Sequence, residues 1–433
     1  MKKLTLAVTG VILALVVGAN YGVYAGGKQA APAQSATAAQ KITVLLPKHE
    51  MDTKDFMEGK ARQFEKESGI QVELINMAWD NVADRVIAEL TAGGSSYDVI
   101  EFDNGWVAKF LNNNWVAPLD SYITPEMKSG ILPGLLDKFS GKGHLYGIAW
   151  NNDTRFFMYN KAKLDAAGIA APPKTWQELK DQSKTLMSKG LVKYGYTDAY
   201  LQGQAGANEI LFAVYAHGGD FFDKDLNLTV LTSPGVKDAY NFLYDGLQVS
   251  KFIDPASLTA SYENAADAFC MGNTAFMLQA WPGVYDQAND ATTSKIVGQI
   301  AVAPYSLSAD GTSQVVLTLP EAMAIPNTSK NKDAAWKYIA YFSSKAFDKE
   351  KALAIGALPI WTDNFNDPQL LTQYPYWQQF GQQAQHARGF ADIEWFDQFS
   401  NVLQIESQKI LLGNISVDKG LEEMNTQLLA IPK

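Results

Sequence analysis

The sequence predicts an α/β fold built as two lobes. Short strands at residues 41–47, 70–76 and 97–103 alternate with helical patterns, and this alternation is typical of a mainly parallel sheet with right-handed crossovers. The chain has 433 residues, of which 47% are hydrophobic. A single core rarely grows beyond about 250 to 300 residues, so a chain of this length predicts more than one lobe.

The N-terminal residues 1–25 have the pattern of a secretory signal peptide. Lys2 and Lys3 precede an apolar run over residues 4–18, and Val23-Tyr24-Ala25 forms a small-x-small cleavage site. The run is too short to span a bilayer comfortably, so we expect cleavage rather than a retained anchor. Residues 26–40 lack an apolar period and predict a flexible leader. No cysteine follows the signal to carry a lipid anchor, so we expect a periplasmic protein.

The charge balance and the missing motifs exclude several classes of protein. The formal net charge is −10, and it is −12 without the two signal lysines, which argues against nucleic acid and anionic ligands. No phosphate-binding loop, no HExxH motif and no paired CxxC is present, and the four histidines have no ligand spacing. We therefore expect no cofactor, no metal site and no catalytic residue. Cys270 has no partner for an intramolecular disulfide, so we expect it to be a small buried side chain.

The first strands carry the first candidate site residues. Three strands, at residues 41–47, 70–76 and 97–103, alternate with helices at 53–68, with Thr53 as a candidate cap, at 81–92 and at 106–111. Ligands bind at the carboxyl ends of the strands in such sheets. This rule selects Glu50 after the first strand, and Asp103 and Asn104 after the third. A helix cap or a solvated loop position is the competing explanation for each of them.

A polar cluster interrupts the stretch GIAWNNDTRFFMYN at residues 147–160. Asn151, Asn152, Asp153 and Arg155 lie directly before an apolar segment that predicts a buried strand. Amide and carboxyl groups that converge at a strand end suit a hydroxyl-rich ligand, because amides donate and accept hydrogen bonds at once. The alternative is a strand end whose polar side chains satisfy neighbouring backbone groups.

The remaining chain predicts further helices and strands around one notable tryptophan. Thr175 and Glu178 form a capping box that opens a helix, and Trp281 follows a predicted strand and precedes a proline. The indole could stack on the apolar face of a pyranose, or it could pack under a loop. Helices are predicted at residues 208–217, 233–250, 262–269, 333–342 and over much of 392–429, strands at 274–278, 300–304 and 322–326, and a bend at 356–361.

Four segments resemble the extracellular solute-binding proteins of bacterial ABC importers, and most closely their carbohydrate-binding group, which includes the maltose and trehalose binders. The segments are YDVIEFDNGW, GHLYGIAWNNDTRFFMYNKAKLDAAGI, GNTAFMLQAWPGVYD and AMAIPNTSKNKDAAWKYI. The resemblance implies a two-lobed periplasmic-binding-protein fold with a ligand cleft between the lobes. It implies three inter-lobe crossings, near residues 150–152, 302–304 and 357–360. Lobe 1 would comprise residues 41–150 and 303–357, and lobe 2 residues 151–302 and 358–433.

The resemblance also implies roles for particular residues. Asp153 matches the acidic ligand residue of the family after the first crossing, Asp103 its acidic residue after the third strand, and Trp281 its stacking aromatic. Arg388 lies near the position of a cleft arginine. One departure is Leu319-Pro320-Glu321, where related sugar binders have a Gly-Gly-Trp-like segment. Glu321 therefore places a carboxylate where the relatives offer a flat face.

The function implied is capture of a sugar or oligosaccharide and its delivery to the membrane permease of an ABC importer, by a monomer that is not an enzyme. A secreted glycoside hydrolase is the first alternative, with Asp103 and Asp153 as the pair of carboxyl groups. The second alternative keeps the fold and changes the ligand to a polyol, a peptide or a polyamine.

Overall fold

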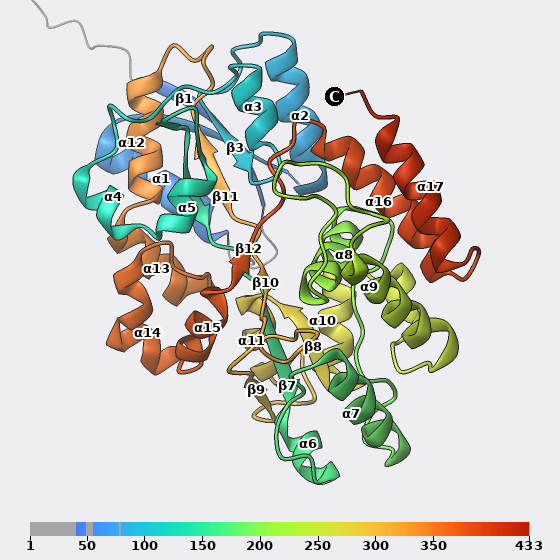
Figure 1. The fold of residues 1–433 in the computed structure, drawn as a ribbon. Helices are drawn as coiled ribbons and strands as arrows, with labels where there is room; N and C mark the ends of the chain where they lie inside the picture. The colour runs from blue at the N-terminus through green and yellow to red at the C-terminus, as the bar shows by residue number, and fades with distance from the viewer. Residues whose placement is uncertain (1–39, 49–54, 78, 433) are drawn as a thin grey trace, which may run out of the picture. The chain divides into compact units, whose positions relative to one another are not determined.

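The computed structural model describes residues 40–48, 55–77 and 79–432, and all of them belong to one unit of the chain. The predicted signal peptide, residues 26–39 of the predicted leader, Glu50 and Thr53 lie outside the described residues. Within the described part of the chain, no helix combines the length and the apolar character that crossing a membrane requires. Figure 1 shows that the chain folds around two separate sheets, each with its own helices.

The larger sheet defines lobe 1 and has five strands in the order β2-β1-β3-β11-β6. As predicted, β1 (Lys41–Pro47) pairs parallel with β2 (Gln71–Met77) and with β3 (Val99–Asp103). The late strand β11 (Glu321–Ala324) runs antiparallel between β3 and β6 (Gly147–Asn151). This insertion brings residues more than two hundred positions apart in the sequence into register at one sheet edge.

A core of aromatic and aliphatic side chains joins this sheet to its helices. Phe102 of β3 stacks on Phe110 of α3 with ring centroids 5.3 Å apart, and both side chains are fully buried. The helices of lobe 1 are α1 (Phe56–Ser68), α2 (Trp79–Thr91), α3 (Val107–Asn112), α4 (Pro125–Gly130), α5 (Pro133–Lys138) and α12 (Lys332–Phe342), and a small hairpin is formed by β4 (Ser140–Gly141) and β5 (His144–Leu145).

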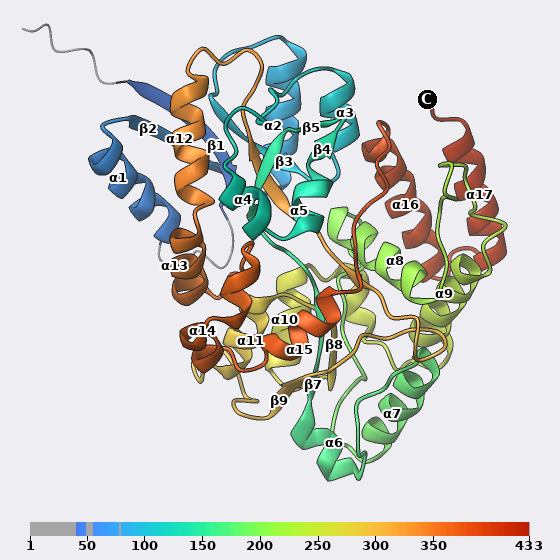
Figure 2. The same cartoon turned by 60° about the vertical axis from the view of Figure 1, so that its left-hand side comes forward.

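The smaller sheet defines lobe 2 and has the order β8-β7-β9. Its central strand β7 (Phe156–Asn160) pairs antiparallel with β8 (Phe276–Ala280) and with β9 (Ile300–Val302). The surrounding helices are α6 (Lys161–Ala167), α7 (Trp176–Ser188), α8 (Gln204–Ala216), α9 (Pro234–Tyr244), α10 (Tyr262–Cys270), α11 (Pro282–Asn289), α14 (Pro368–Gln373), α15 (Trp377–Ala384), α16 (Phe396–Leu411) and α17 (Val417–Leu429). Figure 2 shows α16 and α17 beside α8 and α9, with which they share a core.

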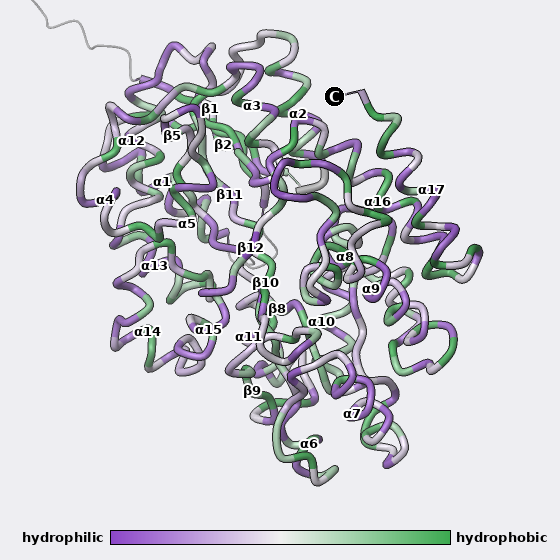
Figure 3. Tube along the Cα trace, in the orientation of Figure 1, coloured by the Kyte–Doolittle hydropathy of each residue, from purple (hydrophilic) through white to green (hydrophobic). Residues whose placement is uncertain are grey.

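Local sequence signals explain how several of these helices begin and pack. Thr175 caps α7 by accepting a hydrogen bond from the N–H of Glu178, as predicted, but the Glu178 carboxylate accepts from the N–H of Lys174, so the capping box is incomplete. The predicted helix over 233–250 is α9 followed by one π-helical turn at Asp245–Val249. Cys270 is buried, as predicted. In Figure 3 the tube of α17 alternates between hydrophobic and hydrophilic colours, as expected of a helix with one packed face.

The chain passes between the two sheets at defined segments. β6 ends at Asn151 and β7 begins at Phe156, so the first crossing lies between them. On the return, Ala303 and Val315 still pack in the core of lobe 2, and the chain joins the larger sheet at Glu321. That point lies later in the chain than the predicted crossing at 302–304, because β10 (Val316–Leu317) first pairs with β12 (Ala387–Arg388). The lobe limits given by the sequence stay predictions.

Buried polar side chains tie the crossing segments together. The Asn152 side-chain amide donates to the carbonyl oxygen of Pro359 at 2.9 Å, and the ammonium of Lys351, in α13 (Lys345–Ile355), donates to the carbonyl oxygen of Trp150. The carboxylate of Asp348 accepts three hydrogen bonds, from the N–H groups of Ile360 and Trp361 and from Asn364, at 2.8 to 3.1 Å. These contacts fix the backbone where the lobes meet.

We expect Asp348→Asn to lower the free energy of unfolding by about 1 to 3 kcal/mol, because an amide cannot accept all three hydrogen bonds and its NH₂ group faces N–H donors. Urea unfolding followed by circular dichroism measures the change. Asp363→Asn is the matched control, since Asp363 is 73% exposed in its ion pair with Lys345 and contributes little. Equal midpoints for the two variants would contradict the structural role of Asp348.

Candidate functional site

Three of the predicted site residues meet at one edge of the larger sheet. In the register of β11, Glu321 lies opposite Asp103 of β3 and opposite Asn151 of β6. The Asn151 side-chain amide donates to Oε2 of Glu321 at 2.8 Å, and all three residues are buried. The structure therefore brings Asp103, Asn151 and Glu321 together at the carboxyl end of β3, where the strand-end rule predicts a ligand.

Asp103 lies in an environment that favours its protonated form. Its carboxylate accepts a hydrogen bond from the N–H of Gly105 at 2.7 Å. Burial raises the pKa of Asp103 to about 7; the Gly105 hydrogen bond opposes this rise, and the negative charge of Glu321 adds to it. The neighbouring Asn104 is also buried, and its Oδ1 has no hydrogen-bond partner among the described residues. This edge can therefore offer both a donor and acceptors to a polar ligand.

The polar cluster of the first crossing divides into structural and exposed parts. Asn152 and Thr154 satisfy neighbours: the Thr154 hydroxyl donates to Oδ1 of Asn152 at 2.9 Å, and Asn152 holds Pro359. This agrees with the alternative that the sequence left open for Asn152. Asp153 accepts a hydrogen bond from Arg155 at 2.6 Å, and 19% of its side chain is exposed. Asp153 is therefore the member of the cluster that a ligand can reach.

Arg155 covers the aromatic pair formed by Tyr262 and Trp281. Its guanidinium lies 4.5 Å from the ring centroid of Tyr262 and 5.1 Å from that of Trp281, within cation–π range. Burial is the largest influence on the pKa of Arg155 and lowers it, but the charge of Asp153 and its hydrogen bond, together with Tyr262 and Glu209, raise the pKa above its usual value, so Arg155 stays a cation. Trp281 is only 6% exposed and belongs to a core cluster. Its stacking on a sugar stays a prediction, whereas its contact with Arg155 is part of the structure.

Two buried carboxyl groups of lobe 2 were missed by the sequence analysis. Glu209 lies in α8, where it is 1% exposed, and its carboxyl shares a hydrogen bond with that of Asp198. Burial raises the pKa of Asp198 to about 6 and raises that of Glu209 as well. The usable signal was a carboxylate followed in the helix by the apolar run Ile210 to Ala216, because a fully buried glutamate is rare without a partner or a function.

The two remaining predicted residues lie apart from this group or outside the described chain. The guanidinium of Arg388 pairs with the carboxylate of Asp220 and lies 3.7 Å from the ring centroid of Tyr215, so its side chain is held within lobe 2. Its backbone reaches the crossing through the pairing of β12 with β10. Glu50 lies outside the described residues, and its role stays a prediction.

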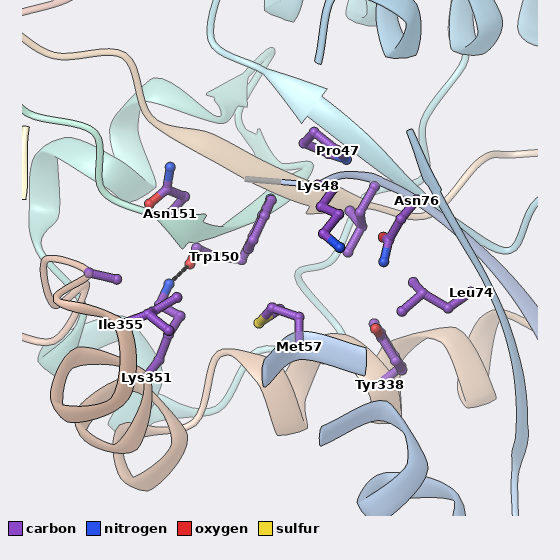
Figure 4. Close-up of a pocket in the computed structure, with 12 residues that line it drawn as sticks. Pro47, Lys48, Met57, Leu74, Asn76, Trp150, Asn151, Tyr338, Lys351 and Ile355 are labelled. Carbon is purple, nitrogen blue, oxygen red and sulfur yellow. Dashed lines mark hydrogen bonds between the residues drawn. The ribbon is translucent and has the colours of Figure 1, made fainter. Parts of the chain in front are cut away.

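A pocket lies beside the crossing on the lobe 1 side (Figure 4). It is formed at the carboxyl ends of β1 and β2, and Figure 4 shows Lys351 reaching the backbone oxygen of Trp150 at its rim. Burial lowers the pKa of Lys351 to about 8, while the charges of Asp348 and Glu321 oppose that shift. The lining residues are Leu46, Pro47, Lys48, Met57, Leu74, Asn76, Trp150, Asn151, Tyr338, Lys351, Ile355 and Ala357.

Contacts between the lobes bring lobe 2 close to the site around Asp103. Lys109 of α3 pairs with Asp397 of α16 at 2.6 Å, and Lys138 of α5 pairs with Asp392 at 2.6 Å. Gly105 permits a close approach, because a Cβ at that position would lie 3.0 Å from the ring of Phe396. Two α/β lobes with a buried polar site on their crossing define the class of two-lobed binding proteins.

Comparison with known proteins identifies the family within this class. The chain belongs to the bacterial extracellular solute-binding proteins, whose family model matches residues 50–349. This confirms the family that the sequence motifs indicated. A putative binding protein of Brucella abortus is 25% identical over 342 residues, which cover 78% of this chain and 80% of that protein. The maltotriose-binding protein of Pyrococcus abyssi is 26% identical over 298 residues, or 68% of this chain and 61% of that one.

A solved structure shows the same fold. The maltose-bound MalE3 protein of T. maritima superposes with a TM-score of 0.81 at 22% identity, over 91% of this chain and 100% of that one. The predicted two-lobed fold is therefore confirmed.

The raised pKa of Asp103 predicts how stability depends on pH. An unfolded aspartate loses its proton near pH 3.8, whereas Asp103 in the folded protein loses it near pH 7. Between these values the folded state binds more protons, so the free energy of unfolding falls as the pH rises. We expect Asp103→Asn to flatten this fall and to be more stable than the unmodified protein at pH 8, with each pKa unit worth about 1.4 kcal/mol.

Urea midpoints at pH 4.5, 6 and 8 measure the effect. Asp363→Asn, the exposed control, keeps the slope of the unmodified protein. If Asp103→Asn and the unmodified protein gave parallel pH profiles, the carboxyl would be ionised throughout and the burial argument would be wrong.

Proposed function

We propose that this protein binds a sugar or a related polyhydroxyl molecule between its lobes in the periplasm and delivers it to the permease of an ABC importer, without altering it. The observation that carries the proposal is the convergence of Asp103, Glu321 and Asp153 beside Arg155 at the crossing between the lobes. Carboxylates and amides bind pairs of hydroxyl groups, and hydrogen bonds to charged groups contribute about 1.5 to 3 kcal/mol each.

The charges and the relatives support this class of ligand. The site has more carboxyl groups than cations, which disfavours anionic ligands. The Pyrococcus abyssi relative is a maltotriose-binding protein and the T. maritima neighbour holds maltose. The ion pairs of Lys109 with Asp397 in α16 and of Lys138 with Asp392 before α16 support closure of the lobes around a ligand.

Glycoside hydrolysis is a second candidate that one observation favours. Asp103 has a raised pKa and Asp153 is held by an arginine, so the two carboxyl groups differ in the way that an acid and a nucleophile do. The family consists of binding proteins, which supports binding over turnover.

A ligand panel tests the proposal. Maltose, maltotriose, mannitol and ribitol are compared with gluconate, spermidine and trialanine by thermal unfolding. At a ligand concentration 100 times the Kd, binding stabilises the folded state by about 2.7 kcal/mol. We expect at least one neutral sugar or polyol to raise the Tm and the other three compounds to leave it unchanged.

The same samples separate binding from catalysis. Incubation of the protein with maltotriose, followed by an assay for new reducing ends, is expected to show none. New reducing ends would show that the protein hydrolyses its ligand, and the proposal of binding without turnover would be wrong. A Tm shift with spermidine or trialanine alone would show that the ligand is a polyamine or a peptide and not a sugar.

A further inference from the structure

Buried polar atoms in lobe 2 lack partners at the point where the ligand site reaches this lobe. Nε and Nη1 of Arg155 and Oε2 of Glu209 have no hydrogen-bond partner among the described residues. The Arg155 side chain is 8% exposed, and Glu209 is 1% exposed. Buried charged groups that stay without partners destabilise a fold, so such atoms are normally satisfied by something bound between them.

Arg155 and Glu209 do not form an ion pair or a hydrogen bond with each other. Arg155 forms its ion pair with Asp153 through Nη2, and the carboxyl of Glu209 shares its hydrogen bond with Asp198. Arg155 thus uses Nη2 for a protein partner and keeps Nε and Nη1 unused. The charge of Glu209 acts on Arg155, so the two side chains lie near each other, and one small polar group that donates and accepts suits both.

The surroundings of these atoms are those of a ligand site. Asp153, which is paired to Arg155, is 19% exposed, and its charge acts on Asp103 across the crossing. The rings of Tyr262 and Trp281 lie against the guanidinium and supply an apolar wall. The rings hold the guanidinium in place, so that its unused N–H groups keep one orientation.

We propose that Arg155 and Glu209 form the lobe 2 end of the ligand site and bind one hydroxyl group of a neutral ligand between them. The free N–H groups of Arg155 donate to the hydroxyl oxygen, and the hydroxyl hydrogen is donated to Oε2 of Glu209. This inference rests on the proposed function and adds to it the residues of lobe 2 that determine specificity.

The chemistry of the pair selects a neutral hydroxyl over charged groups. A carboxylate would suit Arg155 but would meet Glu209, Asp198 and Asp153, whereas an ammonium would suit Glu209 but would meet Arg155. A hydroxyl group donates and accepts, so it satisfies both residues. The hydroxyl group can satisfy both residues whether the proton shared by Glu209 and Asp198 lies on Glu209 or on Asp198.

The test combines two variants with ligands that lack single hydroxyl groups. Each member of the panel of maltose, maltotriose, mannitol and ribitol that binds is titrated calorimetrically, together with its monodeoxy derivatives. Glu209→Gln is nearly isosteric, and Arg155→Lys keeps the charge but not the fork of donors. Glu73→Gln is the control, since Glu73 of β2 pairs with Lys41 of β1 and is 51% exposed.

We expect one monodeoxy derivative to bind the unmodified protein about 10 to 100 times more weakly than its parent. Glu209→Gln and Arg155→Lys should bind the parent with a similar loss and bind parent and derivative almost equally, while Glu73→Gln behaves as the unmodified protein. Circular dichroism checks that each variant is folded. If Arg155→Lys does not fold, the result for Glu209→Gln alone tests the inference.

Two results would overturn the inference, and they are distinguishable. If a panel member binds the unmodified protein and Glu209→Gln equally well, a buried water satisfies these atoms and the proposed function stands without this subsite. If no panel member binds the unmodified protein, the sugar-binding function fails and the inference fails with it.

Discussion

The ion pair between Asp153 and Arg155 is the interaction on which the rest of the site depends. Burying a guanidinium costs a great deal of free energy unless a carboxylate pairs with it, and the 2.6 Å contact supplies that carboxylate. The backbone of both residues is bonded to the returning chain, with the carbonyl oxygen of Asp153 accepting from Leu319 and the N–H of Arg155 donating to Leu317, both at 2.9 Å. One pair of neighbouring residues thus joins the two crossings, the carboxyl groups of lobe 1 and the aromatic wall of lobe 2.

Local patterns were enough to predict the parts of the site that depend on a single strand. Asp103 was selected because it follows a buried strand, and it lies at the carboxyl end of β3. The pairing of Glu321 with Asp103 could not be predicted from local patterns, because it depends on β11 entering the sheet antiparallel from late in the chain. The resemblance to sugar binders drew attention to Glu321, but not to the residue opposite it.

The packing of side chains was the other part of the site that could not be predicted from the sequence. A tryptophan directly after a strand suggests an aromatic surface for stacking on a ligand. Nothing in the segment around Trp281 shows that the guanidinium of Arg155, from the crossing between β6 and β7, lies over its ring. Arg388 was placed in the cleft by position along the chain, whereas its side chain pairs with Asp220 in lobe 2. Glu209 was hidden by the apolar sequence around it, although that contrast was itself the signal.

The polar side chains at the crossing define the chemistry of the ligand. The carboxyl groups of Asp103, Asp153 and Glu321, the amides of Asn104 and Asn151 and the guanidinium of Arg155 lie at the crossing, so a ligand with many hydroxyl groups matches these donors and acceptors. A crystal structure of the protein grown with the panel sugar that stabilises it most tests this directly. We expect the sugar between the lobes, with hydroxyl groups bonded to Asp103 or Glu321 on one side and to Arg155 and Glu209 on the other. A sugar bound to one lobe alone, away from these residues, would contradict it.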